Sequence, residues 1–120
     1  MIQEAIYSIL KEFTNLDSIY LDFVSDKNID NNKTYIVYSL ISSSPYYNFL
    51  YARNVYQIYV YSNSLNKVIK LQEVIGRGFT QLKRVICGVE ICGCNISNEV
   101  QNYVDDFYQA ISTVNILYKY

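Results

Sequence analysis

The stretch Asn54–Leu82, NVYQIYVYSNSLNKVIKLQEVIGRGFTQL, contains the pattern that decides the expected fold. In its first half Tyr56, Ile58 and Val60 alternate with other β-branched and aromatic residues, as in a strand. After the turn SNS at 62–64, whose side-chain oxygens can cap a helix, apolar residues recur at helical spacing. This apolar stripe consists of Leu65, Val68, Ile69, Leu71, Ile75, Phe79 and Leu82. We therefore expect a strand followed directly by an amphipathic helix that packs back on the sheet.

Length and composition indicate one folded domain that spans residues 1–120. Hydrophobic residues make up 51% of the chain, and it holds only one proline and four glycines, which argues against disorder. The apolar runs are too short to span a membrane, and the N-terminal MIQEAIYSILKEF lacks the basic start and cleavage site of a signal peptide. A formal net charge of −1 leaves no broad basic surface for nucleic acid or anionic lipid. We therefore expect neither a membrane nor a specific nucleic acid as a partner.

The N-terminal part of the sequence predicts a second helix and further strands. Residues 2–13 carry apolar side chains at helical spacing. Residues 19–24 predict a short edge strand or an extended connection, and 34–41, apolar on both faces, are typical of a central strand. Between them, the Asn- and Asp-rich segment 25–33 is typical of an exposed turn.

The C-terminal part of the sequence completes the expected sheet. Residues 83–97 predict a β-hairpin or a bent strand, with Gly88 and Gly93 at bulges or tight approaches. A polar connection is expected at 98–106 and a long last strand at 107–118. We therefore expect an α+β fold: a mixed, mostly antiparallel β-sheet of about four strands with two α-helices packed on one face.

The segment Ser42–Arg53, SSSPYYNFLYAR, is unusual because a serine run and the only proline are followed at once by large apolar residues. The serines and the proline are expected to end the preceding strand, which leaves an aromatic loop that is costly to expose to water. The loop folds back on the core, is covered by another subunit, or closes over a ligand. As a candidate oligomer interface we select Tyr46, Tyr47, Phe49, Leu50 and Tyr51, with Arg53 as a polar contact at its edge.

The sequence offers no recognisable catalytic or metal-binding set. Histidine is absent, which removes the commonest general base and every Ser-His or Cys-His nucleophile arrangement. Cys87, Cys92 and Cys94 have the spacing C-x4-C-x-C, which lacks the paired C-x2-C knuckles of a structural zinc site. Because Cys92 and Cys94 fall on one face of the expected strand, we interpret the cysteines as small buried hydrophobes. No cofactor, metal or catalytic residue is therefore expected.

The order of the elements and their local sequences resemble one known family. A helix of sequence IQEAIYSILKEF precedes a strand YIVYSLIS, and an interrupted loop precedes VYQIYVYSNSLNKVIKLQEVI. The last strand has the form DDFYQAISTVNILY. This arrangement resembles the tail-completion or tail-terminator proteins of long-tailed bacteriophages and of phage-tail-like bacteriocins. The resemblance covers nearly the whole chain; the Asn/Asp turn before the first long strand and the cysteine-bearing segment depart from it.

The resemblance implies a non-enzymatic ring, usually a hexamer, that caps the head-proximal end of the tail tube. Such a ring ends tube polymerisation and offers a docking surface to the neck. The implied partners are other copies of the chain, the tail tube protein, and neck or connector proteins. The implied location is the tail or neck of a virion or tail-like particle that is assembled in the bacterial host cytoplasm.

Other functions stay open on the residues themselves. The chain fits another phage head–tail connector or minor tail protein. A sheet rich in tyrosine is also typical of modules that stack nucleic-acid bases, although the tyrosines here scatter over both faces of the expected strands. A small enzyme is the third alternative, and the missing catalytic set argues against it.

Overall fold

The computed structural model describes residues 2–16, 18–22, 34–46, 51–80, 82–104 and 107–119. These residues include two helices and six strands. In chain order they are α1 (Ile2–Thr14), β1 (Ile19–Leu21), β2 (Tyr35–Tyr46), β3 (Tyr51–Ser62), α2 (Leu65–Phe79), β4 (Arg84–Ile86), β5 (Val89–Val104) and β6 (Phe107–Lys119).

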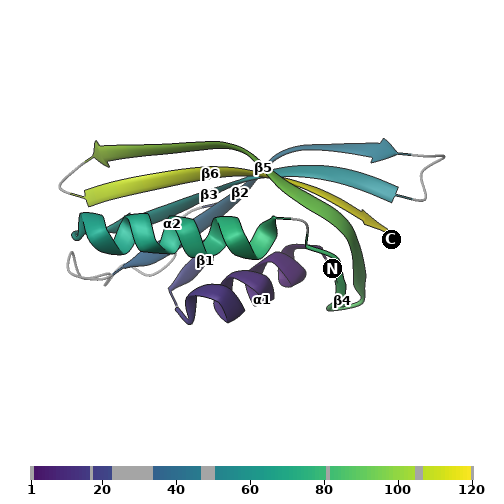
Figure 1. The fold of residues 1–120 in the computed structure, drawn as a ribbon. Coiled ribbons are helices and arrows are strands. Elements are labelled where there is room, and N and C mark those ends of the chain that lie inside the picture. The colour runs from purple at the N-terminus through teal and green to yellow at the C-terminus, as the bar shows by residue number, and fades with distance from the viewer. Residues whose placement is uncertain are drawn as a thin grey trace.

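All six strands form one sheet in the order β1-β2-β3-β6-β5-β4. Every neighbouring pair is antiparallel except β1 and β2, so the sheet is mixed and mostly antiparallel, as the sequence predicted. The expected strand–helix unit is confirmed as β3 and α2, and both helices lie on the same face of the sheet (Figure 1). The predicted number of about four strands is wrong, because β1 and β4 are edge strands of three residues each.

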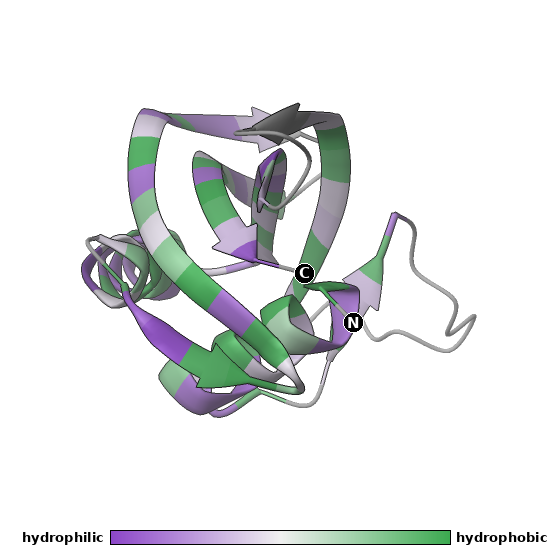
Figure 2. Cartoon of the chain, turned by 90° about the vertical axis from the view of Figure 1, so that its right-hand side faces the viewer, coloured by the Kyte–Doolittle hydropathy of each residue, from purple (hydrophilic) through white to green (hydrophobic). Residues whose placement is uncertain are grey.

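The core lies between the two helices and the inner face of the sheet, which we define as the face toward the helices. Alternate residues of β3 and β6 are buried on it, as the strand period requires. They are Ala52, Asn54, Tyr56, Ile58, Val60 and Ser62 on β3, and Ala110, Ser112, Val114, Ile116 and Tyr118 on β6. From α1 the core receives Ile2, Ala5, Ile6, Ile9 and Leu10. The end-on view of Figure 2 shows the sheet curling around this interior into a half-barrel.

Two strands are much longer than the sequence suggested. The serine run and Pro45 do not end β2, which continues to Tyr46 and pairs with β3 as a long hairpin. Pairing with β1 ends at Tyr38, so β2 is an edge strand at Pro45. Proline is tolerated there because an edge strand does not need every N–H as an inter-strand donor. The expected polar connection at 98–106 is also wrong, because β5 runs to Val104. The two hairpins, β2–β3 and β5–β6, point to opposite ends of the molecule (Figure 1).

The core face of α2 differs in detail from the predicted stripe. Val68, Ile75 and Phe79 are fully buried, but Leu65 and Ile69 are 42% and 40% exposed. Gln72 is buried instead, because it lies one turn from Val68 and from Ile75 on the same side of the helix. The helix is therefore amphipathic as expected, with its core face rotated away from Leu65 and Ile69.

The start of α2 corrects the expected cap, and its end contains two glycines. Ser64 occupies the N-cap position without a side-chain cap hydrogen bond; instead the Oγ of Ser62 accepts a hydrogen bond from the Ser64 N–H at 3.2 Å. Gly76 and Gly78 belong to the last turn of the helix. Thr80 ends the helix by donating from both its N–H and its Oγ1 to the Gly76 carbonyl.

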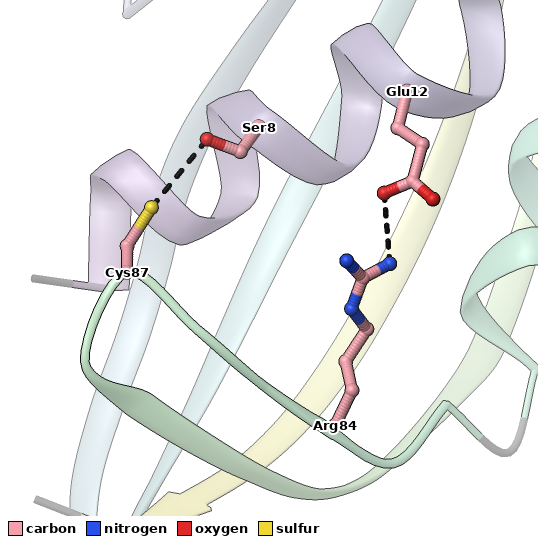
Figure 3. Close-up of polar contacts among 4 residues, drawn as sticks. All are labelled: Ser8, Glu12, Arg84 and Cys87. Carbon is pink, nitrogen blue, oxygen red and sulfur yellow. Dashed lines mark hydrogen bonds and ion pairs between the residues drawn. The ribbon is translucent and has the colours of Figure 1, made fainter.

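The short β4–β5 hairpin contacts α1 through Arg84 and Cys87. Its turn contains Cys87 and Gly88 with φ values of 50° and 75°, a tight turn that suits glycine at the second position. Figure 3 shows two polar contacts that tie the hairpin to the helix. The guanidinium of Arg84 donates to Glu12 at 2.8 Å, and the Sγ of Cys87 lies 3.5 Å from the Oγ of Ser8.

Candidate assembly surfaces

Of the predicted interface residues, Tyr46, Tyr51 and Arg53 lie in the described part of β2 and β3. Tyr47, Phe49 and Leu50 fall outside the described residues, and Tyr46 is described only as the last residue of β2. Tyr51 begins β3, pairs with Tyr46 across the hairpin and is half-buried. Tyr46 and Tyr51 are therefore paired strand residues rather than parts of a free loop, and the role of the segment as an interface stays a prediction.

Arg53 is exposed on the outer face of the sheet, which we define as the face away from the helices. It lies beside a shallow hollow of about 380 Å³ that is also lined by Gly93, Asn95, Asn115 and Leu117. These neighbours come from β5 and β6, so the hollow crosses three strands. An arginine at its rim suits a polar contact with another protein.

The outer face carries a cluster of aromatic rings, the outer aromatic cluster, made of Tyr35, Tyr59, Tyr61 and Phe107. Tyr61 stacks on Tyr35 at 4.8 Å between ring centroids and on Tyr59 at 6.4 Å, and Phe107 meets Tyr35 edge-on at 5.8 Å. Burial within the cluster raises the pKa of Tyr35 and of Tyr59 above the usual 10.0, and the neighbouring Tyr61 adds to both shifts. An antiparallel sheet with one open face usually has polar residues there, so this face is unusually apolar.

Polar side chains fasten the outer aromatic cluster to its surroundings. The amide of Gln109 donates to the hydroxyl of Tyr61 at 2.8 Å, and the hydroxyl of Tyr59 donates to Gln57 Oε1 at 2.5 Å. The rings are therefore held in one arrangement by both stacking and hydrogen bonds. Strand alternation predicts that Tyr59 and Tyr61 share one side of β3, but it does not predict that Tyr35 and Phe107 lie beside them.

Two long stretches of strand edge are not covered by any strand that the structure describes. We call them the β2 edge, residues 39–46, and the β5 edge, residues 92–104. The β2 edge starts where β1 ends its pairing at Tyr38, and the β5 edge starts where β4 ends its pairing at Ile91. Large apolar side chains stay exposed on both: Leu40 and Ile41 at 41% and 53%, and Val100 and Tyr103 at 39% and 62%.

A buried amide joins α2 to the β5–β6 pair. Gln72 Nε2 donates to the carbonyl of Ile111 at 3.2 Å and contacts the carbonyl of Val100 at 3.4 Å, while its Oε1 accepts from Gln101 at 2.9 Å. Beside it, a hollow of about 590 Å³ lies between α2 and β5, where Glu73 forms an ion pair with Arg77. The buried amide therefore orients the helix on the sheet, and its polar atoms are satisfied within the fold.

The cysteines have three different environments, which corrects their interpretation as a buried group. Cys94 is buried, Cys92 is half-buried and Cys87 is exposed. A register shift between Ile91 and Gly93 leaves Cys92 out of the pairing with β6, whereas Cys94 pairs with Ile116 of the core. Burial raises the pKa of the Cys94 thiol to about 12. Within the described part of the chain, no three cysteine or acidic side chains come together in a group that could hold a metal ion.

No helix among the described residues is long and apolar enough to cross a membrane. Taken together, the described surfaces consist of an aromatic sheet face, two exposed strand edges and a hairpin end. They belong to an α+β domain with a curled, mostly antiparallel sheet.

Comparison with known proteins gives a match at the level of the fold. No family pattern and no curated protein matches the sequence. The structure is similar to a chain in the solved virion of a native gene transfer agent (GTA) particle, with a TM-score of 0.72 and 14% sequence identity, over 98% of this chain and 94% of that chain. A second solved protein matches with a TM-score of 0.66 and 12% identity, over 98% of this chain and 96% of its own. The fold is therefore shared with a component of a virion particle along nearly the full length of both chains.

Proposed function

We propose that this chain is a non-enzymatic structural protein of a phage or phage-like particle. More specifically, we propose that it forms a ring, expected to be a hexamer, at the head-proximal end of the tail tube. The ring ends tube polymerisation and presents a docking surface to neck or connector proteins. Its place is then the tail or neck of the particle, after assembly in the bacterial host cytoplasm.

The observation that carries the proposal is the shared fold with the chain of the gene transfer agent virion, which extends over 98% and 94% of the two chains. The proposal also agrees with the resemblance of the sequence to tail-terminator proteins. The exposed strand edges and the outer aromatic cluster give such a chain surfaces for contacts with its own copies and with the tube.

A direct test combines the purified chain with assembled tail tubes from the same particle. The chain alone should form a closed oligomer, measured by native mass spectrometry and by light scattering after gel filtration. A gold label on the chain should appear at one end of each tube, and tubes grown in its presence should stop lengthening. A chain that binds along the tube wall, or leaves tube growth unchanged, would refute the terminator role. Such a result would favour another minor tail or connector protein.

A nucleic-acid-binding module is the second candidate, because the outer aromatic cluster gathers four rings on one open sheet face. The charges argue against it. Arg77 is paired with Glu73 and Arg84 with Glu12, and the formal net charge is −1.

We expect no measurable binding of single-stranded or duplex nucleic acid at physiological salt. Binding through phosphates should appear only at low salt and disappear steeply as ionic strength rises. Fluorescence anisotropy with labelled oligonucleotides at about 50 and 150 mM salt makes the comparison. Micromolar affinity at the higher salt, lost when Tyr59 and Tyr61 are changed to serine, would rank the nucleic-acid function first.

A further inference from the structure

We infer that the subunits of the assembly join edge to edge, with the β5 edge of one copy forming an antiparallel ladder with the β2 edge of the next. This inference rests on the proposed ring and specifies its interface. The partner is a second copy of this chain, and the recognition chemistry is backbone hydrogen bonding supported by exposed apolar side chains.

Exposed strand edges are the first observation. A strand edge presents unpaired N–H and C=O groups, and soluble proteins usually shorten or cover such edges. Here the covering strands β1 and β4 have three residues each, while β2 has 12 and β5 has 16. Among the described residues, no strand therefore pairs with most of either long edge.

The direction of the strands is the second observation. The four long strands β2, β3, β6 and β5 alternate in direction, so β2 and β5 run antiparallel to each other within one subunit. When copies are arranged head to tail, the β5 edge of one copy meets the β2 edge of the next with this antiparallel sense preserved. The joint then continues the ladder of the sheet without reversing it.

The symmetry of such a joint is that of a closed ring. The two edges lie on opposite sides of the same sheet, so each copy offers one edge to each of two neighbours. This is a heterologous contact, which closes into a ring when the rotation between copies is a simple fraction of a turn. Self-pairing of two β2 edges would instead give a two-fold dimer and leave both β5 edges open.

The side chains on the edges provide the third observation. Among the described residues, Leu40 and Ile41 on the β2 edge and Val100 and Tyr103 on the β5 edge are large apolar groups that stay exposed. Only alternate residues of a strand direct their N–H and C=O outward, so a ladder along residues 39–46 would form about five backbone hydrogen bonds, roughly half of the number in a typical protein interface. The β2 edge also has limits, since a register shift between Leu40 and Ser42 and the missing N–H of Pro45 define where a partner can pair.

The test uses two variants that each block one edge with two charges. Variant A carries Leu40→Lys and Ile41→Lys, and variant B carries Val100→Lys and Tyr103→Lys. The control carries Leu65→Lys and Ile69→Lys, which are similarly exposed but lie on α2. All three should fold like the wild type by circular dichroism, because the side chains are already exposed. Native mass spectrometry then measures the assembly state of each.

We expect variants A and B to be monomers by themselves, while the control keeps the wild-type ring. In a 1:1 mixture the intact β5 edge of A meets the intact β2 edge of B, so the mixture should form a one-to-one heterodimer that cannot grow. Hydrogen–deuterium exchange should also show that residues 39–46 and 92–104 are protected in the wild-type ring and exposed in both variants. A ring formed by A or B, or unprotected edges in the wild-type ring, would overturn the inference and leave the proposed ring intact. A wild-type chain that stays monomeric even at millimolar concentration would overturn both.

Discussion

At the scale of single residues, the local register of β5 determines which cysteine is buried, and spacing in the sequence does not. Cys92 and Cys94 are two residues apart, which predicts one shared strand face. The register shift between Ile91 and Gly93 breaks that rule and buries only Cys94 among the core residues. A bulge depends on how two strands meet, so a single strand sequence does not reveal it.

The thiols should therefore differ strongly in reactivity. Burial raises the pKa of Cys94 to about 12, so at pH 8 only about one thiol in ten thousand is ionised, and the thiolate is the reactive form. We expect iodoacetamide at pH 8 to modify the exposed Cys87 first and to leave Cys94 unmodified in the folded protein. Peptide mass spectrometry measures the order, and labelling in denaturant gives the control in which all three react. Equal labelling of Cys87 and Cys94 in the folded protein would contradict the buried position of Cys94.

Gln72 shows a second limit at the residue scale. The sequence suggested that Leu65 and Ile69 face the core, because they extend the apolar stripe of the helix. The structure instead buries Gln72, whose position relative to Val68 and Ile75 is compatible with burial but whose amide argues against it. The deciding factor is the set of partners on β5 and β6, which lie 28 to 40 residues away in the sequence.

At the scale of elements, the sequence predicted the types well and the lengths less well. Periodicity gave both helices, the β3–α2 unit and the alternation of β6, because these segments repeat one clear pattern. It missed the outer half of β2 and the C-terminal half of β5, where serine, asparagine and proline replace the usual strand formers. Pairing with β3 and β6 holds these halves in the sheet, and a partner strand is not visible in local sequence.

The packing of α1 against α2 depends on a glycine in the last turn of α2. A Cβ at position 78 would overlap the ring of Phe13, which also packs edge-on against Phe79 at 5.9 Å. Alanine is about 1 kcal/mol better than glycine in a helix, but overpacking costs about 1–3 kcal/mol. We expect Gly78→Ala to lower the free energy of unfolding by up to about 2 kcal/mol, measured by urea denaturation.

Gly76 provides the matched control within the same turn. A Cβ there would lie 3.1 Å from Glu99 Oε1, the end of a flexible and exposed side chain that can move aside. Gly76→Ala should therefore leave stability unchanged or raise it by up to about 1 kcal/mol. Replacing Phe13 by leucine in the Gly78→Ala background should recover part of the loss. Equal effects of the two alanines would show that the Phe13 contact does not limit position 78.

For the whole molecule, the sequence predicted the fold class more readily than the arrangement of the outer surfaces. The α+β class and the helices on one face follow from local periodicity. The outer aromatic cluster and the two strand edges depend on which strands become neighbours, and that order comes from tertiary pairing. The segment Tyr46–Arg53, which the sequence suggested as an interface, adjoins the β2 edge, and its role stays a prediction.

The last prediction concerns the segment between β2 and β3 and its contribution to the stability of the proposed ring. Each large side chain buried between subunits contributes roughly 1.5–3 kcal/mol, and a closed ring repeats that contribution at every interface. Replacing Tyr47, Phe49 and Tyr51 together by serine should therefore leave a folded chain that no longer forms rings and does not complete tails. Gel filtration with light scattering measures the assembly, and circular dichroism checks the fold.

The outcome of this triple substitution separates three arrangements of the hairpin end. A folded monomer supports a hairpin that reaches onto a neighbouring subunit, with Arg53 at the edge of the contact. Normal rings would exclude the hairpin end from the interface and leave the β2 and β5 edges as the whole joint. Loss of the fold would mean that these aromatic residues stabilise the subunit itself, as the half-buried Tyr51 already does in pairing with Tyr46 and Lys119. Mixing the triple variant with variant B then tests whether its β5 edge still binds a neighbour, because that edge is far along the sheet from the substituted residues.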